Sequence, residues 1–224
     1  PVGSLEAAVA QRLAGQGLLA AAGDAWLIQA GWEALAGALR DAGLLGAWRH
    51  ELLPVTTDQG DQVGQIERAA VRALGITTTA VHLTAQAPDG RTWVQQRAFN
   101  KPNDPGLWDT LMGGMVSAAD TLAQALERET WEEAGLRLDQ LHGLAHAGHL
   151  LISRPSGGAD DVGYTVERID WYSATLPDGV VPANQDGEVE RFDCVDTAQL
   201  RADITAGRYT LEAALILAPD LTAP

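Results

Sequence analysis

Carboxylates at a helical spacing mark the segment LERETWEEAGL, residues 126–136. The segment holds four glutamates and one arginine, and Glu132 and Glu133 follow Glu129 by three and four residues. On an α-helix these three side chains share one face, where like charges repel by about 0.2–0.5 kcal/mol per pair. Magnesium takes oxygen ligands and bridges phosphate oxygens, so a cation held by these acids would turn a repulsive face into a phosphate site. The spacing therefore predicts metal-assisted chemistry on a phosphorylated substrate.

The apolar positions of the same helix place these glutamates beside the core. At about 100° per residue, Leu122, Ala125 and Leu126 project to the side that carries the acids. The alternative is a solvated acidic face, which would put the charges opposite the apolar stripe instead. We therefore expect the three carboxylates to lie at the edge of the hydrophobic core.

Composition and charge limit the classes of function. The 224 residues carry a formal net charge of −15, which opposes binding to the phosphate backbone of a nucleic acid. No apolar run of about eighteen or more residues is free of charge, so we expect neither a membrane span nor a secretory signal peptide. Cys194 is the single cysteine, which excludes an internal disulfide and a cysteine-based zinc site and fits a reducing cytoplasm. We predict a cytoplasmic protein whose partner is a small molecule.

The first 76 residues predict a small α+β domain. Helical patterns cover residues 4–14 and 32–42, and residues 47–55 have the composition of a strand. Residues 62–75 have Ile66, Ala70, Ala73 and Leu74 at a helical spacing and end in glycine, which predicts a third helix.

Residues 77–224 predict a larger domain that contains a β-sheet. Two strands flank the turn sequence PDG at 88–90, which is a hairpin signal. Gly113 and Gly114 suit a tight turn before a helix from about Thr121 to Ala134, and Gly135 is expected to end that helix. One or two short helices should close the chain. Further strands are expected at 141–153, 164–176 and 189–195.

From Gly114 onward, the pattern G-x5-D-x7-R-E-T-x-E-E-x-G-L resembles the Nudix box of hydrolases that split diphosphates linked to another moiety. The family pattern has glutamate where this chain has Asp120 and an aliphatic residue where it has Thr130. Asp120 keeps the charge with a shorter reach, and Thr130 points away from the acidic face.

The resemblance extends through QIERAAVRALGI, TAVHLTA and WVQQRAFNKPNDPGLWDTLMGGMVSA to a subfamily related to the Nudix region fused to some fungal thiamine pyrophosphokinases. It implies an α+β fold in which a mixed β-sheet lies between helices as an α/β/α sandwich. In that subfamily a small extra domain precedes the Nudix fold, which matches residues 1–76 here.

The resemblance also implies roles for residues of the box. Glu132 and Glu133 would bind Mg²⁺, with Mn²⁺ as a substitute, and the Gly114 carbonyl would complete the metal's coordination. Glu129 would be either a further ligand or the base that deprotonates water. Arg128 is placed in the catalytic group, where it would pair with Asp120 and tie the loop to the helix.

Residues outside the box complete the expected site. Nudix enzymes often add an acid from a distant loop, and Glu188 is the first candidate with Glu190 as the second. Both could instead lie on an exposed strand face, because they flank Val189. Arg97 and Lys101 would contact phosphates by the same resemblance, and the alternative for them is ordinary surface charge.

These residues predict a Mg²⁺-dependent diphosphohydrolase. The subfamily resemblance implies thiamine diphosphate or its oxidised derivatives as substrate, cleaved to the monophosphate. Nucleoside diphosphate derivatives and dinucleotides stay open as substrates. An isopentenyl-diphosphate isomerase shares the fold but would need a catalytic cysteine at the sheet mouth, where Cys194 is not expected. A diphosphate-binding sensor without turnover is the non-enzyme alternative. Oligomeric state and the number of metal ions are not specified by the sequence.

Overall fold

The computed structural model describes residues 1–156 and 163–218. The chain divides into two units, the first made of Pro1–Thr79, Val116–Ala119 and Leu151–Arg168 and the second of Ala80–Met115, Asp120–Leu150 and Ile169–Pro224. The boundary after residue 76 between a small domain and a larger one stays a prediction.

Short helices and hairpins make up the N-terminal part of the first unit. The expected helices at 4–14 and 32–42 are confirmed, and the expected strand at 47–55 begins five residues later, at Leu52. The elements are α1 (Ala7–Gly15), β1 (Leu19–Ala22), β2 (Ala25–Ile28), α2 (Trp32–Asp41), β3 (Leu52–Thr56), β4 (Gln62–Glu67) and the 3-10 turn η1 (Arg68–Ala70). The β1–β2 hairpin was not expected, although its two-residue Gly-Asp loop is a hairpin signal.

The predicted helix at 62–75 is wrong. Its first half is strand β4, which pairs antiparallel with β3 so that Leu53 lies opposite Ile66. Ile66, Ala70, Ala73 and Leu74 are all buried as their apolar character suggests. Their burial comes from a strand followed by a short turn, because pairing with β3 overrides the local helical spacing.

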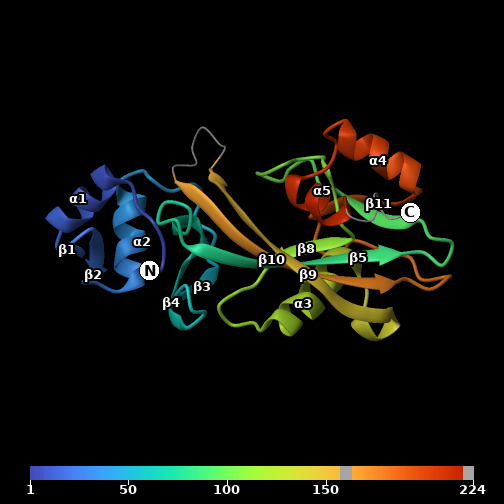
Figure 1. Cartoon of the computed structure of the whole chain (residues 1–224), viewed down its shortest axis with the longest axis horizontal. Helices are drawn as coiled ribbons and strands as arrows, with labels where there is room; N and C mark the ends of the chain where they lie inside the picture. The colour runs from blue at the N-terminus through green and yellow to red at the C-terminus, as the bar shows by residue number, and fades with distance from the viewer. Residues whose placement is uncertain (157–162, 219–224) are drawn as a thin grey trace. The chain divides into compact units, whose positions relative to one another are not determined.

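A seven-stranded sheet contains the strands β5 to β11 (Figure 1). Its path runs β11-β6-β5-β10-β9, while β7 pairs with β6 and β8 with β5. The expected hairpin at PDG is confirmed as β5 and β6, and so are the three later strands. The strands are β5 (Thr77–Gln86), β6 (Thr92–Arg97), β7 (Trp108–Asp109), β8 (Met112–Met115), β9 (His142–Pro155), β10 (Tyr164–Thr175) and β11 (Val189–Val195).

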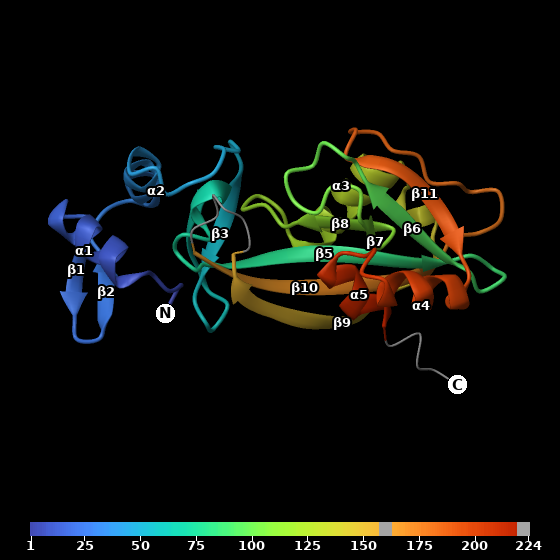
Figure 2. The same cartoon turned by 90° about the horizontal axis from the view of Figure 1, so that it is seen from above.

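Helices cover the two faces of this sheet. Helix α3 (Leu122–Ala134) lies on one face, and α4 (Thr197–Thr205) and α5 (Leu211–Leu217) lie on the other (Figures 1 and 2). A 3-10 turn, η2 (Leu138–Gln140), links α3 to β9. The α+β class with a sheet between helices is therefore confirmed. None of the helices in the described part of the chain is both long and apolar enough to cross a bilayer.

Helix α3 has the ends that its sequence predicts. The Thr121 hydroxyl accepts a hydrogen bond from the Gln124 N–H, and the Gln124 side chain accepts one from the Thr121 N–H, which forms a capping box. Gly135 adopts a left-handed conformation with φ of 62° and ends the helix. Caps at both ends fix the length of the helix that carries the glutamates.

Alternation along β6 divides the residues between the two covered faces. Val94 packs with Leu200, Tyr209, Ala213 and Leu217 in an apolar cluster beneath α4 and α5. Gln95, the next residue, is also buried but contacts Glu133 of α3 on the opposite face. The face that α3 covers therefore contains polar side chains.

Candidate active site

The junction of β8 and α3 brings the box residues together. Gly114 lies in β8, and a Cβ built on it would be 2.0 Å from the Cδ atom of Glu129. Any side chain at position 114 would therefore displace the carboxyl group that lies over the strand. The glycine is needed here for close approach of a charged side chain to the backbone.

Glu133 is the most buried of the acids, with 3% of its surface exposed. Its Oε2 atom accepts hydrogen bonds from the Gln95 amide at 2.8 Å and from the Gly113 N–H at 3.0 Å. Burial raises the pKa of Glu133 to about 8. The two hydrogen bonds lower this pKa, and the nearby charges of Glu129 and Asp109 raise it further. A carboxylate in this position is stabilised by a cation.

Glu129 and Glu132 share one arginine. The Arg128 Nη1 atom donates to Glu129 Oε1 at 2.8 Å and to Glu132 Oε2 at 3.0 Å. Burial raises the pKa of Glu129, the Arg128 charge opposes this rise, and the charges of Glu132 and Glu188 add to it. Glu132 is the most accessible of the three, with 42% of its side chain exposed. As expected, the three acids lie at the edge of the hydrophobic core, and their exposure increases from buried Glu133 to half-exposed Glu132.

Arg128 also ties the loop to the helix. Its Nε and Nη2 atoms donate to Asp120 Oδ2 at 3.0 and 2.8 Å, and Nη2 donates to the Met115 carbonyl at 3.3 Å. The expected Arg128–Asp120 pair is confirmed, so the shorter aspartate reaches its partner. The same guanidinium bridges the loop and two of the three acids.

The donor set has the chemistry that suits Mg²⁺, because all three candidates are carboxylates and Glu133 is buried near the negative charges of Glu129 and Asp109. As the side chains stand in residues 1–156 and 163–218, no three histidine, cysteine, aspartate or glutamate groups converge on one point. The Arg128 contacts explain this, since its guanidinium takes one oxygen of Glu129 and one of Glu132. A bound cation would compete with Arg128 for these two acids.

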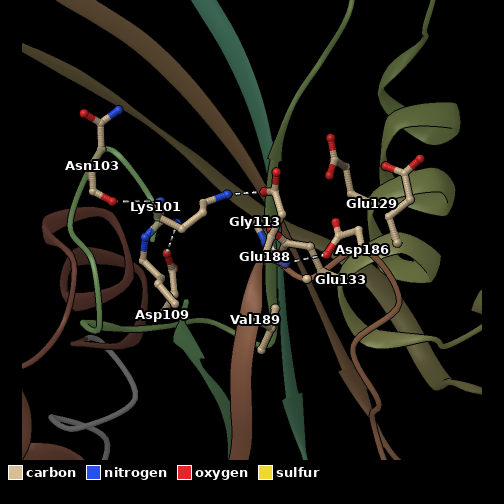
Figure 3. Close-up of polar contacts among 12 residues, drawn as sticks. Lys101, Asn103, Asp109, Gly113, Glu129, Glu133, Asp186, Glu188 and Val189 are labelled. Carbon is tan, nitrogen blue, oxygen red and sulfur yellow. Dashed lines mark hydrogen bonds and ion pairs between the residues drawn. The ribbon is translucent and has the colours of Figure 1, made fainter. Parts of the chain in front are cut away.

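Glu188 approaches the same acids from the loop before β11. Its side chain is half exposed and pairs with the Lys101 ammonium, and its backbone carbonyl accepts from the Ala98 N–H at 2.9 Å. Figure 3 shows the Lys101–Glu188 pair on one side and Glu129 and Glu133 on α3 on the other. The structure therefore brings Glu188 and Lys101 together with the box acids.

Glu188 and Glu190 are both exposed and flank buried Val189, as the alternating pattern predicts, but only Glu190 lies within strand β11. Strand β11 begins at Val189, so Glu188 precedes it, and its N–H donates to Asp186 Oδ1 at 2.8 Å. The pairing of β11 with β6 shifts between Val189 and Arg191, which interrupts simple alternation at Glu190. Glu190 is exposed, and Glu188 is the acid that faces the site.

Arg97 lies at the end of β6, where internal partners hold it. Nη1 contacts Asp109 Oδ2 at 3.4 Å, and Nη2 donates to the Asn103 carbonyl at 3.2 Å (Figure 3). Its Nε atom is buried without a hydrogen-bond partner among the described residues. Phosphate contact by Arg97 and Lys101 stays a prediction, because both cations are paired with carboxylates here.

Sequence reasoning missed three groups of this site. Gln95 and Asp109 lie opposite each other where β6 pairs with β7, and both are buried near Glu133. Gly113 supplies the backbone N–H to Glu133; the tight turn expected at Gly113 and Gly114 is wrong, because both lie in strand β8. Gln95 could have been found from the sequence, because it occupies an inward-facing position of a predicted strand. A buried amide normally requires a hydrogen-bond partner, so a polar group was to be expected opposite it.

Comparison with known proteins agrees with this geometry. The model of the NUDIX domain matches residues 76–215. Nudix hydrolase 20, chloroplastic, of Arabidopsis thaliana is 31% identical over 173 residues, covering 74% of this chain and 44% of the relative. Nudix hydrolase 24, chloroplastic, of the same organism is 29% identical over 169 residues, covering 72% and 44%. The chain thus spans less than half the length of these relatives.

A solved structure supports the fold. The crystal structure of DR0079 from Deinococcus radiodurans covers 75% of this chain and 98% of its own, with a TM-score of 0.60 at 20% identity. The matched domain spans the sheet from β5 onward together with α3 and its glutamates. The chain therefore belongs to the Nudix family.

Proposed function

We propose that the protein is a Mg²⁺-dependent diphosphohydrolase that cleaves a small-molecule diphosphate to the monophosphate and phosphate. The observation that carries the proposal is the meeting of buried Glu133 and partly buried Glu129 with Glu188 and Lys101 at one place. The Arabidopsis relatives are named Nudix hydrolases, which supports a hydrolytic activity.

Each side chain has a proposed task. Glu129, Glu132 and Glu133, with the Gly114 carbonyl, would hold the metal. When bound, Mg²⁺ would supply a Lewis acid that neutralises phosphate oxygens and lowers the pKa of water.

Glu129 or Glu188 would accept a proton from the attacking water. The oxygen of this water would form a bond to phosphorus. At the same time the bridging P–O bond would break, and the leaving phosphate would take its electron pair.

Arg97 and Lys101 are proposed to bind the diphosphate. Both can donate several hydrogen bonds to phosphate oxygens, Arg97 in a bidentate manner. The Lys101–Glu188 pair and the Arg97–Asp109 pair support this role, because both cations lie beside carboxylates. Each cation would exchange a carboxylate for a phosphate.

Thiamine diphosphate or its oxidised derivatives are the proposed substrates. The resemblance of residues 65–76, 79–85 and 93–118 to the Nudix region of fungal thiamine pyrophosphokinases supports this choice. The net charge of −15 also favours thiamine diphosphate, because its thiazolium ring carries a positive charge. Nucleoside diphosphate derivatives and dinucleotides are the alternative substrates.

Phosphorus NMR on the full chain with Mg²⁺ and a panel of diphosphates tests the proposal. The panel contains thiamine diphosphate, its oxidised analogues, nucleotide sugars and dinucleotides. We expect conversion of a thiamine compound to its monophosphate, loss of turnover in Glu133→Gln, and full turnover in Glu127→Gln, which changes an exposed glutamate of the same helix. Undiminished turnover in Glu133→Gln would contradict the site assignment.

Other outcomes separate the alternatives. Turnover of a nucleotide alone would keep the chemistry and remove the thiamine substrate. Tight binding without product would identify a sensor. The cytoplasmic location stays a prediction, since both Arabidopsis relatives are named chloroplastic.

A further inference from the structure

The carboxylate of Glu133 is held by only one of its two oxygens. Gln95 of β6 and the Gly113 N–H of β8 both donate to Oε2. Among residues 1–156 and 163–218, both of these donors are on the sheet, and neither of them contacts Oε1. Oε2 is therefore fixed against the sheet, whereas Oε1 is not bound by either donor.

Gln95 is poorly satisfied where it lies. Its side chain is 1% exposed, and its own Oε1 atom is buried without a hydrogen-bond partner within the described residues. A buried amide oxygen without a donor loses its hydrogen bond to water and is destabilising. Methionine would fill a similar space without this cost, so packing alone does not account for an amide at position 95.

The only hydrogen bond of the Gln95 amide in the described structure is the one to Glu133. When Glu133 is deprotonated, as a metal ligand must be, the opposite amide orientation would set the Gln95 oxygen against a carboxylate oxygen. Donation from Nε2 suits that charged form of Glu133, and the strand backbone on which Gln95 sits keeps the donor in place. The amide thus fixes Oε2 and leaves Oε1 as the oxygen that it does not bind.

We propose that Gln95 is a positioning residue, which holds Oε2 of Glu133 so that Oε1 is presented to the catalytic cation. This inference rests on the proposed function, because it assigns Glu133 as a metal ligand. Partners that orient a metal ligand typically change metal affinity by about 10–100-fold. Gln95 would therefore set affinity for the cation without touching the substrate.

The test is a Mn²⁺ titration of the full chain, with free Mn²⁺ measured by electron paramagnetic resonance. Gln95→Met removes the donor at nearly constant length, and we expect it to raise the Kd for Mn²⁺ at least about tenfold. Gln96→Met is the matched control, because Gln96 is the next residue on the same strand and its amide contacts the Gly106 carbonyl and Arg191 instead. This control should bind Mn²⁺ like the wild type.

An unchanged Kd in Gln95→Met, or equal weakening in both variants, would overturn the positioning role. If Gln95→Met does not fold, Gln95→Asn keeps an amide that is one methylene too short and should weaken binding in the same way.

Glu133→Gln separates the two proposals. Lost Mn²⁺ binding in Glu133→Gln with normal binding in Gln95→Met overturns only the role of Gln95. A wild-type protein that binds no Mn²⁺ overturns both proposals.

Discussion

The two faces of strand β6 differ in what their buried residues contact. Val94 belongs to an apolar cluster in which no member is more than 6% exposed. Gln95, one residue later, contacts a buried carboxylate and leaves one of its own atoms unpartnered within the described structure. The α4–α5 face therefore stabilises the fold, whereas the α3 face holds carboxyl groups whose charged form is destabilised by burial. Sites arranged for function commonly give up stability in this way.

The largest expected effect comes from Glu129 on the α3 face. Glu129→Gln should lower kcat by about 10²–10⁴-fold, which is the usual contribution of a general base. The loss should be larger if Glu129 also binds the metal. Thermal stability without metal should stay the same or rise, because a charge whose pKa is raised by burial is removed. Steady-state kinetics and thermal unfolding of the same preparation measure both effects.

Glu188→Gln refines this prediction. Glu188 is half exposed and paired with Lys101, so its loss should lower kcat less than the loss of Glu129. A larger kcat effect from Glu188→Gln would assign the base to the loop instead of the helix.

The opposite behaviour is expected on the α4–α5 face. Leu200 is 2% exposed in the apolar cluster, and Leu200→Ala should lower the free energy of unfolding by about 2–5 kcal/mol through lost burial and a cavity. The kcat of the protein that stays folded should not change. Denaturant unfolding measures the stability, and steady-state kinetics normalised to the concentration of folded protein measure kcat. A large fall in kcat in fully folded Leu200→Ala would contradict the claim that the α4–α5 face serves stability alone.

Metal-free stability should fall as pH rises. Burial raises the pKa of Glu133 from 4.5 to about 8, so between these values the folded protein keeps a proton that the unfolded chain releases. The unfolded state then binds fewer protons, and stability is lost progressively up to about pH 8, by a few kcal/mol.

Thermal unfolding from pH 5 to 9 measures this slope. Glu133→Gln should remove most of it, and Mg²⁺ should restore the wild type at the alkaline end. An equal slope in wild type and Glu133→Gln would show that other groups cause it.

The sequence predicted elements whose signals are local. The ends of α3 follow from Thr121 and Gly135, and the β5–β6 hairpin follows from a turn of three residues. The helix expected at 62–75 failed because its first half pairs with β3 across the short loop after Thr56, and that hairpin was not recognised in the sequence. The contact between Gln95 and Glu133 joins residues 38 positions apart and depends on how β6 and α3 pack. Residue types and spacing therefore identify the acids, while the groups that orient them emerge from tertiary structure.

The smallest expected effect compares helix caps on the two faces. Thr121 caps α3, and Asp196 caps α4 by accepting from the Gln199 N–H at 2.8 Å; both are exposed. Thr121→Ala and Asp196→Ala should each cost about 1 kcal/mol of stability. Only Thr121→Ala should also weaken Mn²⁺ binding, because α3 holds all three acids and fraying of its first turns loosens the loop that Arg128 ties through Asp120. Equal Mn²⁺ affinity in the two variants would mean that Arg128 holds the loop without help from the cap of α3. The two faces of the sheet would then differ in their side chains and not in the stability of their helices.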